Sequence, residues 1–393
     1  MKNIFEVINS GTSVKEKIIL KFIIADYKFR NKIISVFKHL VFGRLSKEKI
    51  KNILIFRTGS LGDSICALPS IEFIRKCFTG SEIDILTTSG GHSLVSMDNL
   101  IRRDRFRKVI DYTGQSKREL MKLLKFNNYD LVIELPQAHV SLFTELRNMF
   151  AFSRADITYG EGWQISTIKY FRKFQEKHFL FENETKRLLS IISAFGDGDN
   201  RLNNEYYFNI TPEVKKAVID ILDENSLLDC TFIALAVGAK RLQNRWPLKY
   251  FNEIANYLIQ SGFKVIIVGT EDERSLGEQL KQPDVFNLCG KFNPLESAYL
   301  LSLCKFTISN DSGPMHLSYA VGTPVISIFS SRDFPGKWYP PMTNNNVVLR
   351  NFNVPCTICL SESTGKNICN NNICMQGIKP SAVKTEIDTI CNR

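Results

Sequence analysis

The chain has 393 residues, a length that favours two domains of ordinary size over a single core. Hydrophobic residues make up 44% and charged residues 23%, a composition that excludes a mainly disordered chain. The net charge is +11, but twelve Lys or Arg against four Asp or Glu precede residue 52, so +8 of it lies there. Because the remaining chain is nearly neutral, we expect no nucleic-acid partner.

Residues 1–50 are predicted to form a basic amphipathic arm. Apolar residues recur there at near-helical spacing, namely Ile18, Ile19, Phe22, Ile23, Ile34, Phe37 and Leu40. Two interpretations remain open: a helix packed on the body, or a helix in peripheral contact with an anionic membrane. Charged residues interrupt every apolar run and no cleavage site follows one, so we expect neither a membrane span nor a signal peptide.

Five of the ten cysteines stand singly in apolar runs, where free cysteine packs as a small hydrophobe. They are Cys66, Cys77, Cys230, Cys289 and Cys304. This usage argues against a secreted disulfide framework. We therefore expect a cytoplasmic protein, located at the inner face of the cytoplasmic membrane if the arm binds lipid.

Short apolar runs alternate with helical periodicity over 51–205, the predicted N-terminal domain. The expected strands are 53–56, 83–86 and 129–135, and the expected helices are 64–78 and 117–126. Such alternation predicts a parallel, doubly wound sheet. A polar stretch, 196–204, is the candidate linker.

A second series of the same kind covers 206–350, beginning with Thr211 as helix N-cap and Pro212 at the first helical position. The expected strands are 232–237, 264–268, 306–309 and 324–329, with helices at 247–262, 272–281, 294–304 and after Gly313. Residues 351–393 are a cysteine-rich tail with a final helix at 381–391. The predicted fold is α/β, with two Rossmann-like doubly wound domains facing a central cleft.

Two loops carry candidate site residues at the ends of predicted strands. In the first, Ser60, Gly62 and Asp63 lead into a helix, where Asp63 either points into the cleft or caps the helix. In the second, Asp311, Ser312, Gly313 and His316 open another helix, whose free N–H groups suit a diphosphate. His316 can donate to phosphate and Asp311 can accept from a sugar hydroxyl, while the alternative is a capping Asp and a surface His.

Two further loops place charges at the same predicted edge of the second sheet. Glu271 and Glu273 follow one strand, and Lys240 and Arg245 follow another. These cations can neutralise a departing nucleoside diphosphate, so we expect catalysis to require no metal. The alternatives are an ordinary acidic helix start and a solvated basic loop.

These motifs, taken in order, resemble those of glycosyltransferase family 9, the heptosyltransferases. The resemblance rests on Arg-x-x-x-Leu-Gly-Asp at 57–63, Arg-Trp-Pro at 245–247, Gly-Thr-Glu at 269–271 and Asp-Ser-Gly-Pro-Met-His at 311–316. It implies a GT-B fold and inverting transfer of heptose from ADP-heptose to a lipopolysaccharide core or another lipid-linked surface glycan. A protein acceptor and a GT-B-like sugar-nucleotide epimerase remain the alternatives.

The resemblance also implies roles for single residues. Asp63 matches the general base, Asp311, Ser312, Gly313 and His316 match contacts to the donor diphosphate and sugar, and Glu271 or Glu273 matches the nucleoside-side carboxylate. The loop at 236–238 lacks the proline usual in the family, so the cation that contacts phosphate stays open between Lys240 and Arg245.

The tail holds Cys356, Cys359, Cys369 and Cys374 within nineteen residues. A Cys-x-x-Cys pair followed by two further cysteines can form a tetrahedral thiolate site. We therefore consider a structural zinc or iron here, with unligated thiols that stabilise a loop as the alternative.

Overall fold

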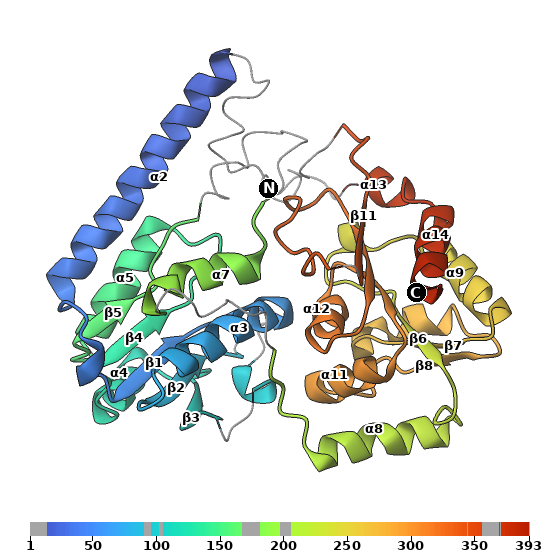
Figure 1. Cartoon of the computed structure of the whole chain (residues 1–393), viewed down its shortest axis with the longest axis horizontal. Coiled ribbons are helices and arrows are strands. Elements are labelled where there is room, and N and C mark those ends of the chain that lie inside the picture. Colours follow the sequence, from blue (N-terminus) through green and yellow to red (C-terminus); the bar gives the residue numbers. More distant parts are fainter. Residues whose placement is uncertain are drawn as a thin grey trace. The chain divides into compact units, whose positions relative to one another are not determined.

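The structure is a computed structural model that describes residues 14–89, 96–101, 105–166, 181–196, 206–343, 345–355, 369 and 371–392. These residues form two compact units (Figure 1). Unit 1 holds the described residues of Met1–Asp98, Arg103–Gln175 and Glu184–Asn204, and unit 2 those of Asn99–Arg102, Glu176–Asn183 and Glu205–Arg393. The domain boundaries at 50, 205 and 350 stay a prediction.

Unit 1 is built on a five-stranded sheet in the order β3-β2-β1-β4-β5, and every neighbouring pair is parallel. The strands are β1 (Asn52–Phe56), β2 (Glu82–Thr87), β3 (Lys108–Asp111), β4 (Leu131–Glu134) and β5 (Tyr159–Glu161). The helices are α3 (Leu61–Cys77), α4 (Lys117–Phe126), α5 (Leu142–Ser153) and α7 (Glu184–Ile192), with 3-10 turns Lys47–Lys49, Met97–Asn99 and Ser193–Phe195. The centre of β1 is wholly buried, as parallel sheets require.

The second half of the N-terminal helix α2 (Val14–Val41) packs on unit 1. Ile34 belongs to the hydrophobic core, and Phe42, just beyond the helix, stacks on Trp163 at 5.2 Å between ring centroids. The Lys38 ammonium lies 2.7 Å from the Glu161 carboxylate. This half of the arm is therefore part of the body. Within the described residues, the structure contains no helix long and apolar enough to span a membrane.

Unit 2 is built on a six-stranded parallel sheet in the order β11-β10-β9-β6-β7-β8. The strands are β6 (Phe232–Ala236), β7 (Lys264–Ile267), β8 (Val285–Asn287), β9 (Thr307–Asn310), β10 (Val325–Phe329) and β11 (Asn346–Arg350). The helices are α8 (Pro212–Glu224), α9 (Leu248–Gln260), α10 (Arg274–Glu278), α11 (Pro294–Leu303), α12 (Gly313–Ala320), α13 (Ile373–Gln376) and α14 (Pro380–Cys391), with 3-10 turns Leu242–Asn244 and Glu271–Glu273.

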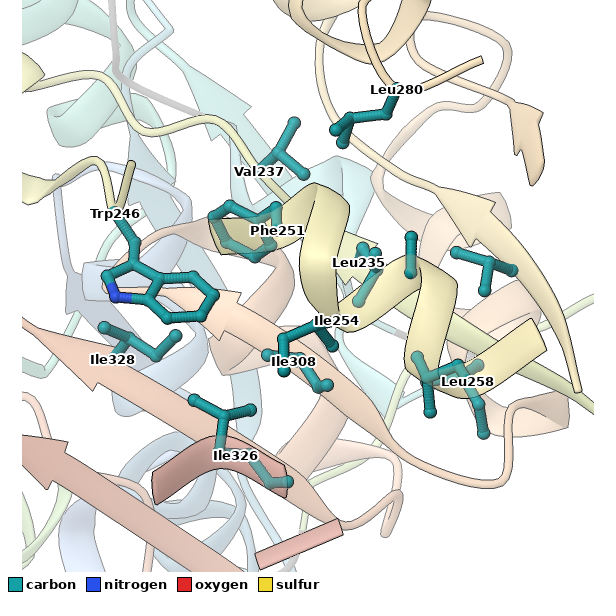
Figure 2. Close-up of a cluster of buried hydrophobic side chains, with 14 of the residues drawn as sticks. Leu235, Val237, Trp246, Phe251, Ile254, Leu258, Leu280, Ile308, Ile326 and Ile328 are labelled. Atoms are coloured by element: carbon teal, nitrogen blue, oxygen red, sulfur yellow. The ribbon is translucent and has the colours of Figure 1, made fainter. Parts of the chain in front are cut away.

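The core of unit 2 ties the C-terminal tail to the sheet. Figure 2 shows Trp246 and the α9 residue Phe251 in one cluster with Ile308 and Ile326. The Trp246 indole N–H donates to the carbonyl of Ile378 at 2.8 Å, immediately before α14. Since α14 also contributes buried residues to this cluster, the last helix is an integral part of unit 2.

Candidate functional site

The strand order of unit 1 reverses between β1 and β4, the position where α/β sheets bind ligands. Arg57 follows β1 directly and is only 1% exposed. Its guanidinium donates to the carbonyls of Leu135 (2.9 Å) and Pro136 (3.2 Å), which follow β4. Through these two hydrogen bonds Arg57 fixes the chain segments after β1 and β4 against each other. Sequence reasoning missed this role.

Asp63 is the third residue of α3 and closes a capping box with Ser60. Its Oδ2 accepts from the Ser60 backbone N–H (3.0 Å) and hydroxyl (2.7 Å). Its Oδ1 lies 3.6 Å from the Arg57 guanidinium, and its side chain keeps 20% exposure. A Cβ at Gly59 would fall 2.3 Å from the Asp63 Cβ, so only glycine fits there. The alternative that Asp63 is the N-cap residue is wrong, because Ser60 takes that position, but the Asp63 side chain does take part in the cap as the N3 residue of the capping box.

Arg57 also belongs to a buried charge cluster. The Glu184 carboxylate lies 3.8 Å from Arg57 and 2.7 Å from Arg187, and all three side chains are buried. Two guanidinium groups thus share the charge of Glu184, while Arg57 also lies beside Asp63. The signal that could have revealed this cluster is an arginine placed directly after an apolar strand, since its charge must then be paired within the fold.

Two buried acidic residues of unit 1 interact electrostatically, Glu134 at the carboxyl end of β4 and Glu145 in α5. Glu134 and Glu145 are both buried, and Asn148 donates to Glu134 at 3.0 Å. Desolvation raises the pKa of both carboxyls well above the usual range, and the charge of Glu134 raises the pKa of Glu145 further. Glu145 is therefore held in its protonated form in the folded state at neutral pH.

We predict that Glu145→Gln stabilises the protein more at pH 8 than at pH 5. The raised pKa means that folded Glu145 keeps a proton that the unfolded chain loses above its ordinary value of 4.5. The wild type consequently loses about 1.4 kcal/mol per pH unit as pH rises above that value, and the Gln variant does not. Thermal melts of both proteins at the two pH values measure this, and equal gains at both would contradict it.

In unit 2 the strand order reverses between β9 and β6, and a buried amide joins these two strands. The Asn310 side chain donates to the carbonyls of Val237 (2.9 Å) and Gly238 (3.2 Å), which follow β6. Its oxygen accepts from the Trp246 backbone N–H at 2.9 Å. Asn310 therefore does in unit 2 what Arg57 does in unit 1, and it fixes the loops that carry the predicted donor contacts.

Asp311, Ser312 and Gly313 form the turn from β9 into α12. Ser312 is the N-cap residue but its hydroxyl makes no capping hydrogen bond, and it donates instead to the Asn310 carbonyl at 3.3 Å. A helix start of this kind favours a bound anion. The predicted alternative, in which Asp311 caps the helix, is wrong because Ser312 takes that position.

The Asp311 carboxyl lies in a hydrogen-bonded chain of buried amide and hydroxyl groups. The Asn244 side-chain amide donates to its Oδ2 at 3.2 Å. The hydroxyl of Ser330, after β10, donates to the side-chain Oδ1 of Asn244 at 2.7 Å. Desolvation and, to a lesser extent, the charge of Asp333 raise the pKa of Asp311 to about 7, while the charge of Arg332 opposes the shift. Asp311 therefore changes charge near neutral pH.

His316 is buried at 4% exposure, which overturns the alternative of a surface histidine. Its Nδ1 lies 2.9 Å from the Tyr319 hydroxyl, one turn further along α12. The Trp338 ring, from the loop after β10, packs edge-on against it at 6.1 Å between centroids. Tyr319 and Trp338 together orient the imidazole. Sequence reasoning missed both of these partners.

The two candidate carboxylates after β7 lie in different surroundings. Glu273 accepts from the Thr270 N–H at 2.9 Å, and its Oε1 lies 2.0 Å from where a Cβ at Gly238 would stand, so it reaches the end of β6. Glu271 is exposed and pairs with Arg274 at 2.6 Å. The structure therefore brings Glu273, and not Glu271, to the loop after β6.

The two candidate cations after β6 also differ. Arg245 is partly buried and donates through Nε to the Ala239 carbonyl at 2.8 Å, which closes the loop on itself. Lys240 is exposed at the loop tip. The Lys240 ammonium is thus in solvent, whereas Arg245 uses one of its N–H groups in a hydrogen bond within the loop.

Two of the four tail cysteines, Cys356 and Cys359, lie outside the described residues. Cys369 and Cys374 are both free thiols, and Cys374 is buried beside the Asn372 side-chain oxygen at 3.6 Å. Within the described ranges, no group of three or more His, Cys, Asp or Glu side chains is arranged to hold a metal. The five cysteines predicted to be free are free in the structure.

Known proteins resemble this chain in both sequence and fold. The chain is 22% identical to lipooligosaccharide heptosyltransferase 2 of Haemophilus influenzae, over 76% of this chain and 88% of that protein. A glycosyl transferase family 9 structure from Veillonella parvula aligns with a TM-score of 0.69 at 20% identity, covering 89% of this chain and 98% of the other. The Veillonella structure therefore shares the fold of this chain.

Two Escherichia coli structures extend the comparison. ADP-heptose LPS heptosyltransferase II aligns with a TM-score of 0.60 at 18% identity, over 87% of this chain and 98% of that one. The iron-containing dodecameric glycosyltransferase TibC aligns with a TM-score of 0.54 at 13% identity, over 87% and 76%. The fold is thus the GT-B fold predicted from the sequence. The model of glycosyltransferase family 9 (heptosyltransferase) matches residues 117–368, and the chain therefore belongs to this family and is a glycosyltransferase.

Proposed function

We propose that this enzyme transfers heptose from ADP-heptose, with inversion, to the core of a lipopolysaccharide or lipooligosaccharide. The observation that carries the proposal is the Asp311 turn at the strand reversal of unit 2, in a chain of a heptosyltransferase family. The names of the Haemophilus and Escherichia relatives support heptose as the sugar and the lipopolysaccharide core as the acceptor.

Unit 2 would bind the donor in this proposal. The uncapped start of α12 offers N–H groups to the diphosphate, and His316, oriented by Tyr319, donates to a phosphate oxygen. Asp311 in its ionised form accepts a hydrogen bond from a hydroxyl of ADP-heptose, and Glu273 contacts the nucleoside of this donor. Lys240 supplies positive charge to the departing ADP, so the proposal needs no catalytic metal.

Unit 1 would supply the general base. The Asp63 carboxylate takes the proton of the acceptor hydroxyl as that oxygen attacks the anomeric carbon. The bond from this carbon to the diphosphate oxygen breaks on the opposite face, and ADP departs with the electron pair. Ser60 and Gly62 hold the loop that positions Asp63, while Arg57 lies 3.6 Å from its Oδ1.

The place where the acceptor is anchored determines where the reaction occurs. We infer that the enzyme works at the cytoplasmic face of the membrane in which such an acceptor is anchored. Family membership favours transfer over the epimerase alternative, which would consume the donor without any acceptor.

A donor panel followed by an acceptor assay tests the proposal. We expect ADP-heptose to raise the melting temperature more than UDP- or GDP-sugars, since a ligand at 100 times its dissociation constant adds about 2.7 kcal/mol. ADP should then be released only when the acceptor is present. Equal release without acceptor would favour epimerase or hydrolase chemistry, and a stronger response to another nucleotide sugar would overturn the choice of donor.

We also propose a structural zinc or iron held by Cys356, Cys359, Cys369 and Cys374. The support is their clustering within nineteen residues and the fold likeness to the iron-containing TibC. Thiolates are the ligands that such sites use, and bound metal would tie the tail to the body.

For this tail we predict about one equivalent of metal per chain, measured by elemental analysis of protein purified without metal-affinity resin. Cys356→Ser with Cys359→Ser should lose it, whereas Cys230→Ser, at a free and partly exposed thiol elsewhere in unit 2, should not. Less than about a tenth of an equivalent in folded wild-type protein would favour unligated thiols.

A further inference from the structure

The outward face of α2 carries a line of large apolar side chains. This α2 stripe consists of Ile18, Phe22, Phe29, Val36 and Leu40, which are between 51% and 76% exposed. The intervals of four, seven, seven and four residues keep all five on one side of a helix with 3.6 residues per turn. The opposite side of the helix supplies Ile34 to the core, and among the described residues of unit 1 the stripe is not part of that core.

Basic side chains line one flank of the α2 stripe. Lys21, Lys28 and Lys32 are exposed and lie about 40–80° around the helix from the stripe. Asp26 lies on the other flank, where it is paired with Arg30 at 2.8 Å. From Ile18 to Leu40, Asp26 is the one acidic residue of the sequence, and its side chain is 39% exposed. The outward face is therefore both apolar and cationic.

The neighbouring helix of unit 1 extends this character. Helix α5 packs against α2, and Figure 1 shows the two helices side by side. It exposes Phe143 (74%) and Phe150 (51%). These two residues are seven positions apart, so they lie on the same side of α5. A line of exposed apolar side chains bordered by basic residues, as on α2, is typical of an interaction site.

We propose that the α2 stripe docks the protein on an anionic lipid bilayer, with the helix axis in the membrane plane. The apolar side chains would enter the boundary between headgroups and acyl chains, and the flanking lysines would contact anionic headgroups. The combination of an apolar line, an adjacent row of cations and a single carboxylate that is already paired with Arg30 matches this partner. The inference rests on the proposed function, since it names the surface by which the enzyme reaches a membrane-anchored acceptor.

Co-sedimentation of the full-length protein with vesicles tests the inference. Vesicles of phosphatidylglycerol with phosphatidylethanolamine should bind the wild type, and pure phosphatidylcholine should bind it at least about tenfold more weakly. Because the lysines contribute electrostatically, binding should weaken as salt rises from 50 to about 500 mM. Phe22→Ser with Phe29→Ser and Leu40→Ser should lower binding by at least about tenfold.

Matched controls come from helix α4 of the same unit. Phe126→Ser removes a side chain that is 85% exposed and should leave binding unchanged. Replacing Lys21, Lys28 and Lys32 by Gln should weaken binding, whereas Lys117→Gln with Arg118→Gln and Lys122→Gln, also all exposed, should not. Wild-type protein that stays in the supernatant at low salt, or a stripe variant that binds normally, would overturn the proposal.

A second copy of the chain is the competing occupant of the stripe. Wild-type protein that self-associates in light scattering, ignores vesicles and becomes monomeric in the stripe variant would overturn membrane docking. The stripe variant should keep wild-type transfer to an acceptor freed of its acyl chains. Failure of docking would then leave this transfer intact, while failure of the proposed function would remove the transfer and leave vesicle binding intact.

Discussion

Replacing Asp63 by Asn is expected to lower the transfer rate by at least about a hundredfold while donor affinity stays near the wild-type value. The carboxylate lies at the strand reversal of unit 1, is fixed through Oδ2 by Ser60, and keeps Oδ1 beside Arg57. The Asn amide can keep the geometry of the loop but cannot take up the proton of the acceptor hydroxyl. Turnover with the acceptor and calorimetric titration with ADP-heptose measure the two quantities.

The capping box complicates this test, and the chain offers a control for it. Glu119 closes the same kind of box with Ser116 at the start of α4. Each substitution, Asp63→Asn and Glu119→Gln, keeps a side-chain oxygen that can accept from the N-cap N–H, so both should change folding stability alike, but only the first should affect transfer. Near-wild-type turnover in the Asp63 variant would remove Asp63 as the base, and an equal loss in both variants would assign the effect to helix capping.

Replacing Asp311 by Ala should weaken ADP-heptose binding by at least about tenfold and reduce turnover with it. The residue follows β9 at the strand reversal of unit 2, and Asn244 holds its carboxyl at 3.2 Å. His316→Ala should give the same combined loss, because the imidazole that Tyr319 orients would be absent. Asp220→Asn, on the exposed surface of α8, serves as the control.

The elevated pKa of Asp311 adds a pH signature. Below pH 7 this carboxyl is mostly protonated, and a neutral carboxyl accepts weaker hydrogen bonds from the sugar hydroxyls than a carboxylate does. Wild-type donor affinity should therefore increase from pH 6 to pH 8, and Asp311→Asn should flatten that dependence. Unchanged nucleotide-sugar affinity in both the Asp311 and His316 variants would show that this turn does not hold the donor.

Local sequence signals predicted much of the fold. The helix at 117–126 and the N-cap Thr211 with Pro212 at the first helical position are confirmed, since turn chemistry and helical periodicity are encoded in adjacent residues. Helix α3 begins at Leu61 instead of 64, because the Ser60 capping box includes Asp63. The edge strands β3, β5, β8 and β11 were not predicted, since strands of three to five residues give too little alternation.

The surroundings of the site residues were less predictable. The sequence identified Asp311 and His316, but not the Trp338 ring or Ser330, which come from a loop that is distant in the chain. Likewise the burial of Glu145 follows from packing between elements, since nothing near it in the sequence separates it from a solvated helix residue. Polar side chains that tertiary structure buries are not revealed by periodicity alone.

The interleaved assignment of the chain to the two units bears on the construction of hybrid enzymes. The described part of Glu176–Asn183 belongs to unit 2, where the Phe181 N–H donates to the Pro335 carbonyl at 2.7 Å and its ring packs on Phe334. A chimera joined near residue 205 would pair a foreign version of this segment with the native Phe334 loop. A hybrid of two family members should therefore take residues 181–183 from the same parent as the C-terminal half, although these residues precede α7 of unit 1 in the chain.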